Sequence, residues 1–155
     1  METKEIITTL FYTGFQAHVF HLQTTSYAEH MALGGFYEAV QGAADAWAEA
    51  LIGSKNGKRP DFATSIELQN YKEGVSTPFV TQFADWLVRI SNLPTDILNM
   101  RDDLLGVCHK TLYLLSLDGN KKAPEEQEPM GGEMEEEATE PPEAETQPQE
   151  PLPTE

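Results

Sequence analysis

The fold is decided by residues 4–53, KEIITTLFYTGFQAHVFHLQTTSYAEHMALGGFYEAVQGAADAWAEALIG, where apolar residues recur at helical spacing on either side of one polar break. The break, Thr24-Thr25-Ser26, consists of residue types that cap helix N-termini. The pattern therefore predicts one helix over residues 4–23 and a second over residues 27–53. Gly34 and Gly35 leave open whether the second helix runs unbroken near its start.

A long connection separates this helix pair from two further helices. Residues 54–78, SKNGKRPDFATSIELQNYKEGVSTP, hold turn signals such as Asn56-Gly57 and show only weak periodicity. A third helix is expected from Pro78 to just before Leu93-Pro94, and a fourth, capped by Thr95, is expected to reach residues 118–119. Four helices with a long crossover between the second and the third predict an all-α, ferritin-like four-helix bundle.

The charge of the chain is concentrated at its C-terminal end. The formal net charge is −16, and twelve of the 26 acidic residues follow Lys122, the last basic residue. The segment beyond Lys122 is rich in Pro and Glu, so it cannot bury enough apolar surface to offset the entropy lost on folding. We therefore expect a ferritin-like four-helix domain over residues 1–119 and a disordered, acidic, Pro/Glu-rich tail over residues 120–155.

Composition also bounds the compartment and the partners. Cys108 is the single cysteine and lies in an apolar helical pattern, which indicates core packing in a reducing compartment. No stretch is apolar enough for a membrane span, and the first residues lack the pattern of a signal peptide. An acidic chain without a basic arm gains nothing from counterion release on DNA. We expect a cytoplasmic protein that binds neither membrane nor DNA.

Ionisable residues on the inward stripes of the first two helices form the candidate functional site. His18 and His21 continue the apolar seam of the first helix. On the second helix, Asp45 and Glu49 are expected to lie on the same side as His30, along the stripe through Gly34, Tyr37, Gln41 and Ala44. Imidazole nitrogens and carboxylate oxygens together suit iron, manganese or zinc. Each of these residues, taken singly, is also typical of packed or solvated positions.

The stretch from Gln16 to Leu51 resembles the first two helices of Dps-type mini-ferritins. That family has a histidine in a QAHW or HW context, a second histidine twelve residues on, and an Asp-x-x-x-Glu pair beginning fifteen residues later. Four residues match these positions without a gap: His18, His30, Asp45 and Glu49. A similar pattern is found in ferritin-like proteins of tailed phages, where the first histidine corresponds to His21. The choice between His18 and His21 stays open.

The resemblance implies an iron-binding homo-oligomer. In the family the two histidines come from one subunit and the Asp and Glu from its two-fold mate, and the four residues are ferroxidase ligands. The chain is then expected to oxidise Fe(II), to sequester it, or both, at dinuclear sites, with another divalent metal as the alternative. Gly34 departs from the family, which often has a further acidic ligand there, and Val19 or Leu22 replaces a tryptophan. One carboxylate fewer predicts weaker metal binding.

Two further features bear on assembly. Large apolar side chains lie on more than one face of the first two helices, among them Phe20, Phe36 and Trp47. A single small bundle is not expected to cover all of these faces, so the pattern favours a homo-oligomer. Asp102 and His109, seven apart on the fourth helix, form a second and weaker candidate pair that is more typical of a surface or an interface.

The alternative hypothesis assigns the chain to a different functional class. Under this alternative, the chain is a phage-encoded structural or interaction protein, found in the host cytoplasm or the virion, that keeps the helical scaffold without catalysis. Its histidines would serve packing or hold a structural metal. Four-helix bundles host many activities, so the fold does not choose between the two functions.

Overall fold

The computed structural model describes residues 1–62 and 65–117, and every regular element within them is an α-helix. The helices are α1 (Thr3–Gln23), α2 (Tyr27–Ser54), α3 (Ser76–Val88) and α4 (Thr95–Ser116). For these described residues, the prediction of an all-α fold with four helices is confirmed. The expected acidic tail, residues 120–155, lies outside the described residues. Among the described helices, none combines the length and the apolarity needed to cross a membrane.

The ends of α1 and α2 agree closely with the predicted ones, whereas α3, expected to continue to just before Leu93-Pro94, already ends at Val88. The Ser26 side chain caps α2 by accepting a hydrogen bond from the Glu29 backbone N–H at 3.2 Å, as its residue type favours. α2 then runs unbroken through both of its early glycines. The prediction that Thr95 caps α4 is wrong, because Pro94 holds the N-cap position and its carbonyl accepts the first helical bond, from Leu98. α3 begins two residues before the expected Pro78.

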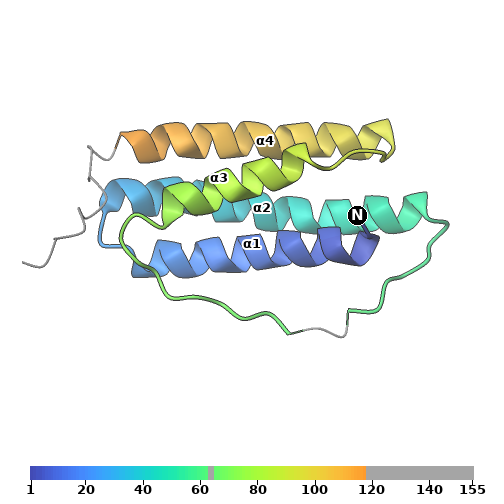
Figure 1. The fold of residues 1–155 in the computed structure, drawn as a ribbon, viewed down its shortest axis with the longest axis horizontal. Helices are drawn as coiled ribbons and strands as arrows, with labels where there is room; N and C mark the ends of the chain where they lie inside the picture. The colour runs from blue at the N-terminus through green and yellow to red at the C-terminus, as the bar shows by residue number, and fades with distance from the viewer. Residues whose placement is uncertain (63–64, 118–155) are drawn as a thin grey trace, which may run out of the picture. The chain divides into compact units, whose positions relative to one another are not determined.

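The connection between α2 and α3 returns along the length of the bundle. Figure 1 shows α1 and α2 antiparallel, α3 parallel to α2, and α4 antiparallel to α3. Because α3 runs in the same direction as α2, the chain has to travel back from the end of α2 before α3 can start. The long crossover predicted from the sequence is therefore present.

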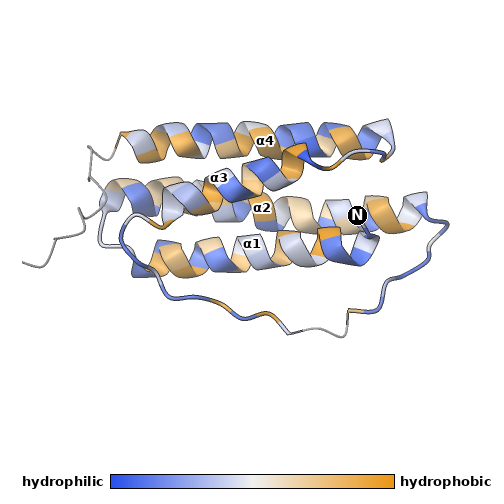
Figure 2. Ribbon diagram, in the orientation of Figure 1, coloured by the Kyte–Doolittle hydropathy of each residue, from blue (hydrophilic) through white to orange (hydrophobic). Residues whose placement is uncertain are grey.

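Apolar side chains from all four helices meet in one core. α1 packs mainly on α2, α2 on α4 and α4 on α3, whereas α1 and α3 touch at few residues. Figure 2 shows that every helix mixes apolar and polar residues, as expected for helices with one buried stripe. Phe20, Phe36 and Trp47 are buried in this core, so the expectation that one bundle leaves them uncovered is wrong. All three side chains point inward in the complete four-helix bundle.

Side-chain amides of α1 hold the second half of the crossover, residues 65–75, which we call the strap. Buried Gln16 donates from Nε2 to the Gln69 carbonyl at 2.8 Å and accepts from the Gln69 N–H at 2.7 Å. Gln23, two turns later, accepts from the Tyr71 N–H at 2.6 Å. Gln16 thus satisfies both backbone groups of Gln69, and Gln23 satisfies one backbone group of Tyr71.

The strap is also anchored at the start of α2. The Tyr71 hydroxyl donates to Glu29 Oε2 at 2.7 Å, and Thr24 donates to the same oxygen. Burial, and after it the hydrogen bond to Glu29, raises the pKa of Tyr71 above its ordinary value. The phenol therefore keeps the proton that it donates, and the buried Glu29 carboxylate keeps two hydrogen-bond donors.

Gln16→Leu is expected to destabilise the protein by about 1–3 kcal/mol, because it leaves the N–H and the carbonyl of Gln69 without their buried partner. Urea unfolding measures the loss, and faster tryptic cleavage at Lys72 would report a loosened strap. Gln23→Leu is the matched control, since Gln23 is exposed and water replaces its hydrogen bonds. Equal losses in the two variants would contradict a special role for Gln16.

Cys108 is a buried free thiol on α4, as predicted, and burial raises its pKa to about 12. Because the ordinary value is 9.0, the native thiol stays protonated at pH 8 and is expected to resist a thiol reagent until urea unfolds the chain. The raised pKa also adds stability that is complete below about pH 9 and is lost as the pH rises towards 12. Reaction of the native protein at the rate of the unfolded chain would contradict this prediction.

Candidate functional site

The structure brings His18, His21 and His30 together with Tyr37 where α1 packs on α2, and we call these four residues the histidine cluster. His21 and His30 stack with ring centroids 3.7 Å apart and planes 23° apart. His18 stacks on Tyr37 at 4.1 Å with the rings almost parallel, and Tyr37 also meets the His21 ring edge-on at 5.1 Å. All four side chains are half-buried, so the cluster lies at the edge of the core.

Reciprocal hydrogen bonds orient the two stacked histidines. His21 Nδ1 lies 2.8 Å from the His30 carbonyl oxygen, and His30 Nδ1 lies 2.9 Å from the His21 carbonyl oxygen. A carbonyl oxygen only accepts, so each Nδ1 has to carry the proton. In a neutral imidazole the remaining lone pair is then on Nε2, the arrangement in which histidine usually binds a metal ion.

Gly34 provides the room for the His21 ring. A Cβ atom at residue 34 would lie 3.3 Å from Cε1 and 3.4 Å from Nδ1 of His21, which is closer than ordinary contact. A larger side chain there requires the ring to shift. Glycine at residue 34 thus leaves the space that the His21 ring occupies.

Asp45 and Glu49 lie away from the histidine cluster. Both are exposed, although Ala44 beside them is buried, so the expectation that they share the inward stripe is wrong. Successive residues of a helix are about 100° apart, and this step carries Asp45 from the buried to the solvent side. Fifteen residues along α2 also separate Asp45 from His30 by about 22 Å. One chain therefore cannot bring these carboxylates and imidazoles onto one ion.

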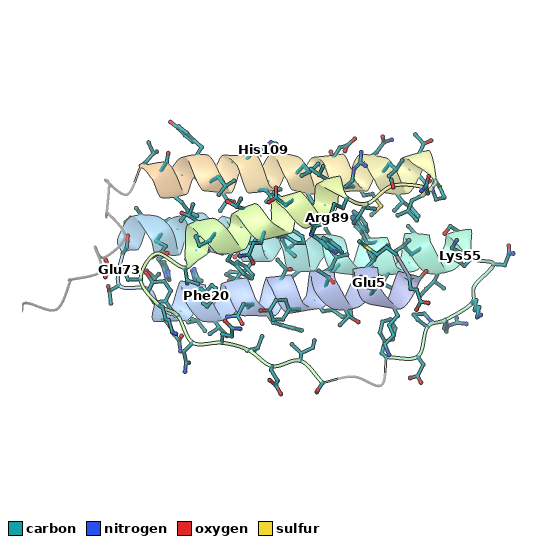
Figure 3. All side chains as sticks on the ribbon, viewed as in Figure 1. Glu5, Phe20, Lys55, Glu73, Arg89 and His109 are labelled. Carbon is teal, nitrogen blue, oxygen red and sulfur yellow. The ribbon has the colours of Figure 1, made fainter. Side chains whose placement is uncertain are left out.

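The second candidate pair does not form a site. Asp102 and His109 are both exposed on α4, and Asp102 forms an ion pair with neighbouring Arg101 at 2.7 Å. Figure 3 shows His109 on the side of α4 that faces away from α1. Within residues 1–62 and 65–117 of a single chain, no three histidine, cysteine or carboxylate side chains are grouped so that they could hold a metal ion.

Sequence analysis missed the polar contacts of the strap. Gln16, Glu29 and Tyr71 have no helical or turn pattern that singles them out, and the hydroxyl of Tyr71 reaches a carboxylate 42 residues earlier. Glu29 immediately precedes His30, so these contacts brace the turn from which the second stacked histidine projects. Only the path of the crossover across α1 could have revealed them.

Comparison with known proteins gives a family without a function. Residues 21–115, more than half of the chain, match the model of a Family of unknown function (DUF5856). The matched segment begins at His21 and includes His30, Asp45 and Glu49. No curated protein and no solved structure matches the chain.

Proposed function

Because the chain belongs to DUF5856, a family whose function is unknown, we propose a function from the geometry: a ferritin-like, iron-binding homo-oligomer. Its sites combine His21 and His30 of one subunit with Asp45 and Glu49 of another. The observation that carries the proposal is the pair of reciprocal Nδ1 hydrogen bonds, which leave both Nε2 atoms available as ligands. His18 stacks on Tyr37 beside this pair and is the alternative first ligand.

The exposure of the carboxylates supports a site shared between subunits. Within the described part of the chain, no hydrogen bond or ion pair engages Asp45 or Glu49, so both are available to a second molecule. They are four residues apart and lie on one face of α2, where two carboxylates can grip one or two metal ions. The topology supports the same proposal, since a long crossover between the second and third helices is the ferritin-like arrangement.

A two-fold axis near residues 38 and 39 of α2 would complete the site. If two copies of α2 cross antiparallel there, residue n of one lies opposite residue 77 − n of the other. His30 then faces the stretch centred between the partner subunit's Asp45 and the partner subunit's Glu49. The same register places Gly35 opposite the partner's Gly42, and both glycines have open space in the single chain. It also covers Met31, which is 56% exposed, with the partner's Ala46.

The donor set fits iron as substrate. Imidazole nitrogens bind Fe(II), and the hard carboxylate oxygens stabilise the Fe(III) that forms. Two Fe(II) ions held close together supply two electrons, which with two protons reduce one hydrogen peroxide to two waters; O₂ is the alternative oxidant. The chain contributes the positions of the ligands, while the redox chemistry belongs to the metal.

Glu38→Cys is expected to form a disulfide between two copies under mild oxidation, because residue 38 lies beside the proposed axis and meets its own counterpart there. Non-reducing gel electrophoresis should show a cross-linked dimer. Lys110→Cys, at an exposed position of α4, is the matched control and should not cross-link. Native Cys108 is buried and does not interfere. Light scattering that finds only a monomer at micromolar concentration would refute the shared site.

A structural or interaction protein remains the second candidate, because the stacking of His21 on His30 would serve packing equally well. Metal content after purification without chelator distinguishes the two. Iron bound in a fixed ratio to the subunit, and lost in Asp45→Asn with Glu49→Gln, supports the metal site. A metal-free, fully folded oligomer supports the structural protein.

A further inference from the structure

A groove opens where α1 and α3 fail to pack closely. Its volume is about 360 Å³, and aromatic rings from both helices line it: Tyr12 of α1, and Phe79, Phe83 and Trp86 of α3. The Phe83 and Trp86 rings stack at 5.6 Å with planes 17° apart, and Tyr12 meets Phe79 edge-on at 6.5 Å. The ring walls therefore present flat apolar surface to whatever occupies the groove.

The size of the groove suits a small molecule. Ligand pockets span about 300–1,000 Å³, so this one is at the lower end of the range. Two or three fused rings, stacked against aromatic walls, fill it well.

Charged groups at the groove select the chemistry of that molecule. Arg89 lines one end, is exposed, and makes no side-chain hydrogen bond or ion pair within the described part of the chain. Figure 3 shows Arg89 where α3 ends. Asp85, one turn earlier, also lines the groove but forms no ion pair with Arg89. The guanidinium is thus free for one carboxylate, and Asp85 repels a second anionic group.

We infer that the α1–α3 groove binds a flat aromatic compound that carries a single carboxylate. The rings of the compound lie between Tyr12 and Trp86, and its carboxylate meets Arg89. Thr9, Thr13 and Gln82 supply further polar contacts along the groove. The site is separate from the histidine cluster, because it uses the face of α1 towards α3 and the cluster uses the face towards α2.

Nuclear magnetic resonance with naphthalene-1-carboxylate as the probe tests the inference. The chain has two tryptophans, and only Trp86 lines the groove, while Trp47 is fully buried in the core. The indole N–H signal of Trp86 should move and saturate as the probe is added, and that of Trp47 should stay in place. The test is run on the full chain and needs no metal, so it is independent of the proposed iron site.

Variants and analogues identify the contacts. Arg89→Gln should weaken binding about fivefold or more, and Arg59→Gln, the same change outside the groove, should leave it unaltered. Tyr12→Leu should weaken it by removing one ring face. The neutral naphthalene-1-methanol should bind more weakly than the carboxylate. An immobile Trp86 signal at millimolar probe, equal binding by the two arginine variants, or tighter binding of naphthalene-1-methylamine would each overturn the inference.

Discussion

Loss of Fe(II) oxidation is expected in two variants that share no substituted residue. The first replaces the imidazoles (His18, His21 and His30 to Ala), and the second replaces the carboxylates (Asp45→Asn with Glu49→Gln). Each removes half of the ligands of every proposed site, so neither should oxidise Fe(II) above the uncatalysed rate. Absorbance of the ferric product measures the rate, and circular dichroism checks that the helices remain.

Co-expression of the two variants is expected to restore about a quarter of the wild-type activity. In a mixed dimer, one interface site carries both defects and the other carries neither. Random pairing makes about half of the dimers mixed, and half of the sites in those dimers are intact. If a single subunit supplied all the ligands, every site would stay broken and nothing would return.

Asp102→Asn with His109→Ala is the matched control, because both residues are exposed on α4 and lie outside the histidine cluster. This variant should oxidise Fe(II) at the wild-type rate. Full activity in either the imidazole or the carboxylate variant would dismiss those residues as ligands. A structural or interaction role would then explain the protein better than iron oxidation does.

Trp47→Ala is expected to lower the free energy of unfolding by about 3–5 kcal/mol. Trp47 is fully buried in the C-terminal half of α2 and is among the largest side chains of the core, so its truncation leaves a cavity between helices that cannot fully collapse. Domains of this size are stable by about 5–15 kcal/mol in total, so the melting temperature should fall by at least about 10 °C.

Tyr113→Ala is the control for an exposed aromatic residue, since Tyr113 is 62% exposed on α4, and its effect should stay within about 0.5 kcal/mol. Trp47→Phe keeps most of the buried surface. It breaks no hydrogen bond, because Trp47 Nε1 has no partner within the described residues, and it should cost less than the alanine variant. An alanine variant as stable as the Tyr113 control would contradict the placement of Trp47 at the centre of the core.

The histidine cluster shows how far a spacing argument reaches. His18 and His21 are predicted to share the inward face of the first helix, and both rings contact Tyr37 of α2, because residues three apart share a helix face whatever the helix packs against. Which histidine stacks on His30 depends on the rotation and depth of α1 against α2. Gly34 leaves the space that the His21 ring fills, whereas in the sequence the same glycine indicated only the absence of an acidic ligand.

Asp45 marks the point where the same argument fails. Eleven residues are three helical turns plus about 20°, so periodicity places Asp45 on nearly the same side of α2 as Gly34, but it does not say how much of that side the other helices cover. Here the bundle buries Ala44 and leaves Asp45 in solvent. The fifteen-residue spacing between His30 and Asp45 fits the pattern of the resembling family, but the two residues lie at separate places along one helix.

The sequence by itself determined the four helices, a cap for α2 within residues 24–26, the long crossover and the burial of Cys108, because propensity, capping and periodicity act between residues close in the chain. Only the tertiary structure decided that Trp47 is core, that the strap pairs with Gln16, and that Arg89 stands unpaired at an aromatic groove. These properties depend on which surfaces distant segments cover. That choice is made by the packing of all four helices at once, so no local pattern contains it.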